Sequence, residues 1–171
     1  MFKKFSFTKE LSKEEELQEY ICAAKKVPIK YIQKNIIDLD IDIENYEYSP
    51  AEAILELGLD EELVQDLVED FVIQIVKYKP IFLMYIDRLR KKGSDDEQLD
   101  CTKLRDLAHK NLGVARNLRI ADAQFILSEL MKKDDLDYLD MCAKALEACV
   151  IKLKPEVAFK TSKLIEIKVS L

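Results

Sequence analysis

Apolar residues recur every three or four positions through most of this 171-residue chain. In the stretch from residue 59 to residue 89 they are Leu59, Leu63, Leu67, Phe71, Ile75, Tyr78, Phe82, Leu83, Ile86 and Leu89. This spacing places apolar side chains on one face of an α-helix, and comparable patterns follow at residues 99–118, 121–132 and 136–153. Only three glycines and four prolines interrupt the chain. The pattern therefore predicts an all-α protein.

Local breaks divide this region into helices joined by short connections. The run Ser-Pro-Ala-Glu at residues 49–52 has the form of a helix start, and Gly58 is expected to end that short helix. Pro80 is expected to kink or break the next helix, because its nitrogen has no hydrogen to donate. Asp134 and Asp135 precede the last helix, which Pro155 should stop. Because short links make neighbouring helices antiparallel, residues 49–155 are predicted to form an antiparallel up-down four-helix bundle.

The two ends of the chain are expected to be additions to that bundle. Residues 1–48 form an N-terminal accessory segment with a helix over residues 8–26, capped by Thr8 or Ser12 and ended by Pro28. Residues 156–171 form a C-terminal tail. Two segments, 39–48 and 164–171, alternate apolar and polar residues and are candidates for short extended structure.

Charge and composition exclude several classes of function. The net charge of −6 has the wrong sign for a protein whose affinity depends on neutralising phosphates, so we expect no nucleic-acid partner. The apolar runs are shorter than the roughly 20 residues that span a bilayer, and the N-terminus lacks the apolar stretch of a signal peptide, so we expect a cytoplasmic protein without membrane attachment. Cys22, Cys101, Cys142 and Cys149 form no Cys-x-x-Cys pair and are interpreted as small apolar residues.

His109 is the only histidine in the chain, and Gly113 follows it by one helical turn. Steps of about 100° per residue place His109 on the side of its helix opposite to the apolar residues Leu104, Leu107, Val114 and Leu118. A glycine within a helix costs about 1 kcal/mol relative to alanine. Because a helical side chain leans toward the N-terminus, a glycine at this position leaves the imidazole open to a docking protein.

The run Leu-Ala-His-Lys-Asn-Leu-Gly-Val-Ala-Arg-Asn-Leu at residues 107–118 resembles the histidine-containing phosphotransfer (HPt) domain of bacterial two-component phosphorelays. That family carries the motif Ala-His-x-Leu-Lys-Gly-x-Ala followed by a leucine. Phe71 falls where the family has a phenylalanine in the preceding helix, and the region of Leu130 falls where its next helix ends. The resemblance covers residues 59–153 and implies the four-helix bundle that the apolar pattern also predicts.

The resemblance implies a phosphocarrier rather than an enzyme. His109 would accept a phosphoryl group from the aspartate of a response-regulator receiver domain and relay it, with a hybrid histidine kinase as a further partner. The receiver would supply Mg²⁺ and a lysine, so the chain itself would need no cofactor and no ATP site. A solvent-exposed imidazole is largely neutral at cytoplasmic pH and needs no activating base.

The sequence departs from the family motif at two positions. The family's leucine two residues after the histidine is Asn111 here, which we expect to be buried and hydrogen-bonded. The family's lysine is Leu112, which we expect to be partly exposed beside His109, where a lysine would be tolerated. Lys110, Arg105 and Arg116 are the nearby cations that could compensate, and Arg116 is the best placed.

The loss of that lysine motivates an alternative function. In it, the chain is a helical adaptor, a degenerate HPt domain that binds receivers or other signalling partners without being phosphorylated.

Other chemistry is disfavoured by the residues present. Asp106-x-x-His109 has the spacing of a carboxylate-bridged metal motif, but a di-iron site needs two such histidines, so we expect no metal. Cys101 lies about two turns from His109 with no evident oxyanion donors, which disfavours a cysteine nucleophile. The phosphate-binding loops GxxxxGK[ST] and GxGxxG do not occur.

Overall fold

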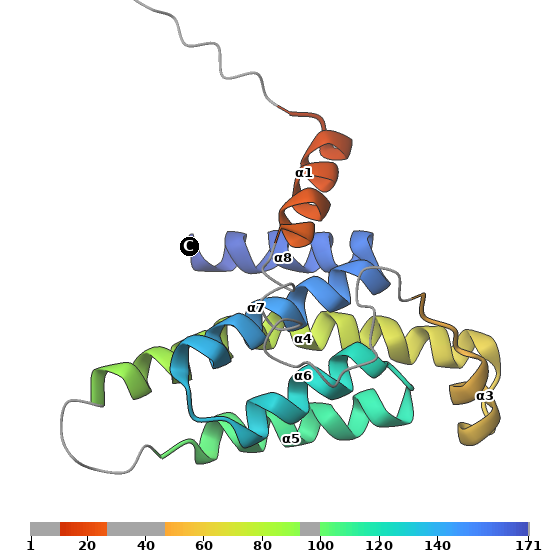
Figure 1. Cartoon of the computed structure of the whole chain (residues 1–171). Helices are drawn as coiled ribbons and strands as arrows, with labels where there is room; N and C mark the ends of the chain where they lie inside the picture. The colour runs from red at the N-terminus through yellow and green to blue at the C-terminus, as the bar shows by residue number, and fades with distance from the viewer. Residues whose placement is uncertain (1–10, 27–46, 93–99, 171) are drawn as a thin grey trace, which may run out of the picture.

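The chain is all-α over the residues that the computed structural model describes, which are 11–26, 47–92 and 100–170 (Figure 1). These ranges contain seven helices: α1 (Lys13–Lys25), α3 (Ala51–Leu57), α4 (Glu61–Lys92), α5 (Thr102–Asn117), α6 (Ala121–Lys132), α7 (Leu136–Leu153) and α8 (Pro155–Val169). The same ranges contain no strand. The prediction of an all-α fold is confirmed.

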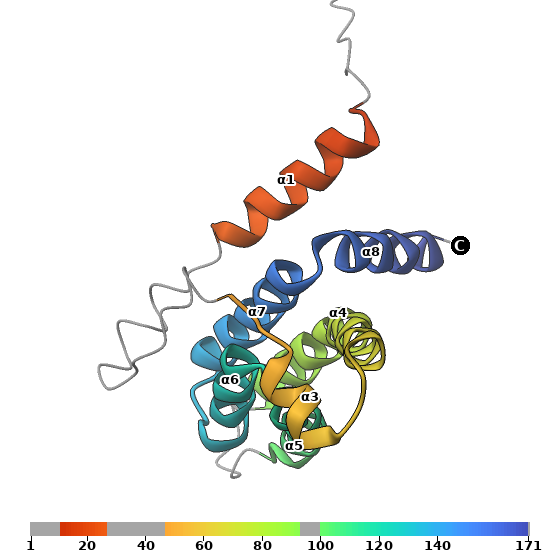
Figure 2. The same cartoon turned by 90° about the vertical axis from the view of Figure 1, so that its right-hand side faces the viewer.

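The helices are arranged in layers around α4 and α7, which pack against each other at the centre. On one side lie α5 and α6, which pack together and contact α4 and α7 respectively. On the opposite side lies α8, in contact with both α4 and α7, and α1 packs outside it against α7 and α8 (Figures 1 and 2). The short helix α3 packs against α4 and α5. Every layer thus has at least one face against the central pair.

The core is built mostly from apolar residues of α4 to α8, to which α1 adds Ala24 and α3 adds Ala53. Its largest fully buried side chains are Phe71, Phe82, Ile75, Ile86, Leu104, Leu118, Ile120, Ile126, Leu127, Leu130 and Leu139. On α4 the buried stripe begins with Val64 and Val68, whereas Leu63 and Leu67 are 48% and 40% exposed. The predicted stripe is therefore correct from Phe71 onward but rotated at its start, where the valines one position later are buried in place of the leucines.

Capping residues set several helix ends as the sequence predicts. The Ser12 hydroxyl accepts a hydrogen bond from the backbone N–H of Glu15, and the Glu15 carboxylate accepts one from the N–H of Ser12. Gly58 ends α3 in the left-handed conformation, with φ of 63°. Asp135 accepts a hydrogen bond from the backbone N–H of Tyr138 at the start of α7. The alternative cap Thr8 lies outside the described residues.

Pro80 does not break α4, so of the kink or break expected at this residue the break is wrong. The helix continues from Glu61 to Lys92 with Pro80 inside it. Pro80 itself is exposed, and it leaves the carbonyl of Val76 without the hydrogen bond that an N–H at position 80 would donate. Ile75 and Phe82 on either side are buried, and their packing holds the two halves of the helix in one element.

The prediction of an extended C-terminus is wrong, because residues 155–169 form α8. Pro155 is in the first turn of this helix, where a proline has no hydrogen bond to lose. Ala158 and Thr161 are buried at helical spacing and Ile165 is half-buried against the core, while Ile167 and Val169 of the alternating pattern are exposed. Contact with α4 and α7 thus overrides the local alternation. The other candidate extended segment, apart from residues 47 and 48, lies outside the described residues.

Replacement of Pro80 by alanine tests whether this residue strains α4. Alanine restores the missing backbone hydrogen bond, so Pro80→Ala should raise the free energy of unfolding by about 1–3 kcal/mol. Urea unfolding followed by circular dichroism measures this change. A less stable variant would show that a bend at Pro80 is needed for both halves of α4 to pack.

Candidate functional site

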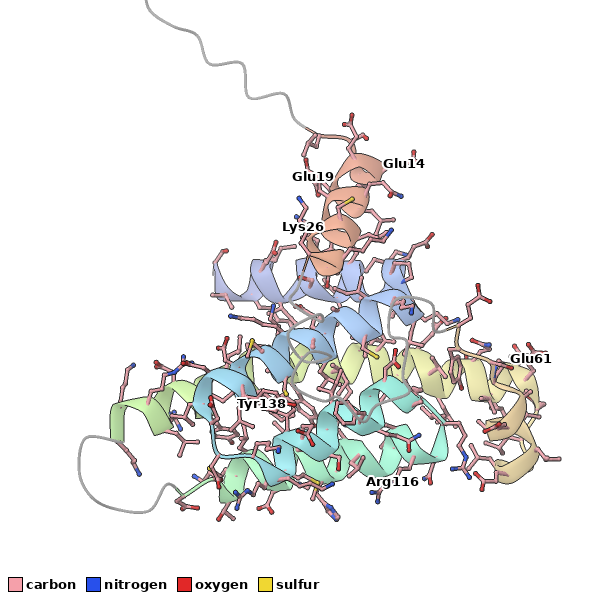
Figure 3. All side chains as sticks on the ribbon, viewed as in Figure 1. Glu14, Glu19, Lys26, Glu61, Arg116 and Tyr138 are labelled. Atoms are coloured by element: carbon pink, nitrogen blue, oxygen red, sulfur yellow. The ribbon has the colours of Figure 1, made fainter. Side chains whose placement is uncertain are left out.

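The outer face of α5 carries the residues that the sequence singles out. His109, Lys110, Gly113 and Arg116 are exposed there. In the part of the chain that the structure describes, the side chains of His109, Lys110 and Arg116 make no hydrogen bond or ion pair. Figure 3 shows Arg116 at the outer edge of the molecule, on the side away from α8. These side chains are therefore available to a partner rather than committed to the fold.

Asn111 lies on the opposite face of α5, fully buried, as predicted. Its amide oxygen accepts a hydrogen bond of 2.8 Å from Nε2 of Gln74 on α4, and its Nδ2 donates one of 2.7 Å to the carbonyl of Leu107. The Asn111 amide thus makes one hydrogen bond to α4 and one within α5. Because Asn111 must face α4, His109, about 200° away around the helix, must face outward.

Leu112 is buried, which corrects the expectation that it is partly exposed beside His109. Its side chain is only 3% exposed. The predicted apolar face of α5 is centred on its large apolar residues, which are Leu104, Leu107, Val114 and Leu118. Leu107 and Val114 are only half-buried, however, and lie at one edge of the buried face. Because α5 packs against α6 as well as α4, the buried arc extends to Ala108, Leu112 and Ala115. No side chain at position 112 can reach the exposed face without leaving the core.

The cations predicted to support His109 fall into two groups. Arg105 is half-buried and forms an ion pair of 2.5 Å with Asp134, in the connection between α6 and α7. Lys110 and Arg116 remain on the exposed face with His109. Arg105 therefore ties α5 to the next connection, and only the other two are placed to meet an anion.

Gly113 borders open space. A Cβ atom added there would have no heavy atom of a neighbouring side chain or helix within 4 Å. The residue therefore does not permit a close crossing with another helix, which is the usual structural reason for a glycine within a helix. Because glycine has no side chain, the helix surface one turn after His109 is instead left uncovered.

The turn after α5 is held by residues that the sequence analysis did not identify. Arg119 adopts the left-handed conformation with φ of 57° and forms an ion pair with Glu56 of α3. The hydroxyl of Tyr48 donates a hydrogen bond of 2.9 Å to the carbonyl of Leu118. The backbone N–H of Ile120 closes the end of α5 by bonding the carbonyl of Ala115. Arginine is not a residue typical of this conformation, so the sequence carried no signal for it.

The cysteines do not extend the site. Cys101, Cys142 and Cys149 are buried, and Cys22 is exposed on α1. Burial raises the pKa of Cys101, the thiol nearest in sequence to His109, so the nucleophilic thiolate is disfavoured. Among the described residues, no three histidine, cysteine or acidic side chains come together as a metal site. Nor is any helix in the described ranges both long enough and apolar enough to cross a membrane.

Comparison with known proteins gives no further guide: no protein-family model, curated protein or solved structure matches this chain.

The burial of Leu112 predicts the outcome of restoring the lysine found in the HPt motif. Leu112→Lys places a charge in the core and should lower the free energy of unfolding by more than about 2 kcal/mol. Lys110→Ala, at the exposed neighbouring position, is the matched control and should change it by less than about 0.5 kcal/mol. Chemical denaturation of both variants measures the difference. Equal stability of Leu112→Lys and the parent chain would mean that α5 is rotated from the position described.

Proposed function

We propose that this chain is a histidine phosphotransfer protein in which His109 accepts a phosphoryl group from the aspartate of a receiver domain and relays it in a two-component phosphorelay. The observation that carries the proposal is the environment of His109. This imidazole is exposed and unpartnered within the described structure, on a helix whose opposite face is fixed in the core, and Gly113 leaves the next turn bare. A group that must enter another protein's active site needs this combination of exposure and rigid support.

The arrangement of α4 to α7 supports the proposal. Contacts join α4 to α5, α5 to α6, α6 to α7 and α7 back to α4, which is the contact pattern of a four-helix bundle. The colours of Figure 1 let the reader follow the chain as it reverses direction from each of these helices to the next. An antiparallel HPt-like bundle accounts for both features.

The chemistry needs only a nucleophile and charge stabilisation from this chain. The lone pair of one imidazole nitrogen attacks the phosphorus of an aspartyl phosphate, a nitrogen–phosphorus bond forms, and the bond from phosphorus to the carboxylate oxygen breaks. The carboxylate leaves on the receiver, which would also hold Mg²⁺. Lys110 and Arg116, the two unpaired cations beside His109 in the described structure, can stabilise the phosphoryl charge from this chain's side.

One observation favours a second function, that of a non-phosphorylated adaptor. Leu112 occupies the position of the motif's lysine and is buried, so the positive charge of the motif is missing at that position. In this case the face of α5 would bind a receiver domain without accepting its phosphoryl group. Binding that persists with no labelling of His109 would distinguish the adaptor from the carrier.

Labelling of His109 tests the proposed function directly. The full chain is incubated with receiver domains charged by radiolabelled acetyl phosphate and, separately, with phosphoramidate, which phosphorylates histidine without a protein partner. We expect acid-labile, alkali-stable phosphate on the parent chain and none on His109→Gln. Because His109 is exposed and unpartnered, the thermal midpoint and helix content of the variant should match those of the parent.

Lys103→Gln is the matched control, since Lys103 is an exposed lysine of the same helix that has no assigned part in the reaction. Phosphate that remains on His109→Gln would overturn the assignment. Binding of charged receivers without labelling of the parent chain would favour the adaptor.

Substitution of Gly113 tests the importance of the bare turn beyond His109. Gly113→Ala should stabilise the helix by about 1 kcal/mol and reduce transfer only slightly, because its Cβ meets nothing within 4 Å. Gly113→Leu should slow transfer from a receiver much more strongly while leaving reaction with phosphoramidate nearly unchanged, since only a protein partner needs the open surface. If Gly113→Leu accepted phosphate from receivers at the parent rate, docking would not depend on this turn.

A further inference from the structure

The interface between α6 and α7 contains two buried carboxyl groups facing two buried thiols. Asp122 and Glu129 are seven residues apart on α6, and Cys142 and Cys149 are seven residues apart on α7. In addition to burial, the charge of Asp122 raises the pKa of Cys149, and the charge of Glu129 raises the pKa of Cys142. Because seven residues are close to two turns, the interface repeats the same pairing at two levels.

The two carboxyl groups differ in their partners. Glu129 accepts a hydrogen bond of 2.9 Å from the hydroxyl of Tyr138, which Figure 3 shows between α6 and α7. The position equivalent to Tyr138 at the level of Asp122 is Ala145, seven residues further along α7, whose methyl group has nothing to donate. Asp122 is only 1% exposed, and both of its carboxylate oxygens lack a hydrogen-bond partner. A carboxyl group thus faces a thiol at both levels, but a tyrosine donates a hydrogen bond only to Glu129. Asp122 is left as a buried acid without a hydrogen bond to either oxygen.

An ionised carboxylate in this position is costly, because neither of its oxygens receives a hydrogen bond in place of the water it has lost. Two titratable groups of α7 face Asp122, namely Cys149 and Lys152. Burial raises the pKa of Cys149, so it stays a neutral thiol. Lys152 is exposed, and its charge lowers the pKa of Asp122 by less than burial raises it, to a final value of about 6. No charged residue of α5, the other helix packed on α6, acts on this carboxyl group.

We propose that Asp122 is a buried proton-binding site whose occupancy controls how firmly the first turn of α6 packs against the end of α7. With the proton bound, the group is neutral and one oxygen becomes a donor. Without it, the charge must be hydrated, which requires the contact between the two helices to loosen.

The direction of the pH dependence follows from the raised pKa. The folded chain holds this proton more tightly than the unfolded chain, whose aspartate has the ordinary value of 3.8. The resulting stability is fully present below that ordinary value and is lost as the pH rises through about 6. Ionisation of Asp122 therefore destabilises the fold near neutral pH.

Urea unfolding of the full chain at about pH 5 and about pH 7.5 tests the proposal, with Asp122→Asn and Glu129→Gln compared with the parent. The unfolding equilibrium constant of the parent, divided by that of Asp122→Asn, should rise about tenfold between these two pH values. Asp122→Asn keeps the shape of the side chain and cannot ionise. Glu129→Gln should retain the pH dependence of the parent, because the acid it removes has a partner.

An equal pH dependence in the parent and Asp122→Asn would overturn the proposal, as would loss of that dependence in Glu129→Gln. If Asp122→Asn does not fold, the parent chain decides the question through the ¹³C signal of the Asp122 carboxyl carbon. Titration of that signal near pH 6 supports a proton-binding site. Titration near the ordinary pKa of an aspartate contradicts it.

Discussion

The rotational setting of α5 depends on one buried amide. Asn111 has donors and acceptors that must be satisfied away from water, and the structure satisfies them through Gln74 of α4 and the carbonyl of Leu107. Turning α5 toward solvent on that side would break the bond to Gln74, and turning it the other way would bury His109. The hydrogen bond from Gln74 to Asn111 therefore fixes the register of α5 against α4 and the outward direction of the histidine, while the bond to Leu107 satisfies the amide nitrogen within α5. A leucine at this position could pack in several orientations, whereas an amide accepts few.

Packing on two sides then determines what is left on the surface of α5. Contact with α6 buries Leu112 and Ala115, and the ion pair between Arg105 and Asp134 commits one cation to the connection after α6. His109, Lys110 and Arg116 remain exposed and unpaired within the described structure, and together with the exposed Asp106, one turn before His109, they leave a small excess of positive charge on this face in a chain of net charge −6. This local excess of positive charge matches the chemistry of a phosphoryl acceptor.

Local signals in the sequence predict the helix ends better than they predict the burial of individual residues. The caps at Ser12 and Asp135 and the stop at Gly58 depend on neighbouring backbone atoms, so the sequence alone identifies them. The helix at residues 155–169 and the burial of Leu112 depend on contacts with other helices, which no local pattern encodes. The continuity of α4 at Pro80, by contrast, agrees with the apolar spacing that runs through residues 59–89. The lack of a hydrogen-bond donor for Asp122 also depends on a contact between helices. It becomes evident only when α7 is aligned with α6, because Ala145 then occupies the position equivalent to Tyr138.

Two of the helices outside the proposed bundle, α1 and α8, do not contact α5. Helices α8 and α1 lie beyond the central pair α4 and α7, on the side opposite to α5 (Figure 2). They are held there by the ion pair of Lys163 with Glu16 and by the contact of Tyr20 with Phe159, whose ring centres are 5.5 Å apart. Because this layer packs on α4 and α7 rather than on α5, it can stabilise the central pair without approaching His109. Changes in α1 or α8 should thus act on the stability of the bundle and leave the chemistry of the exposed histidine intact.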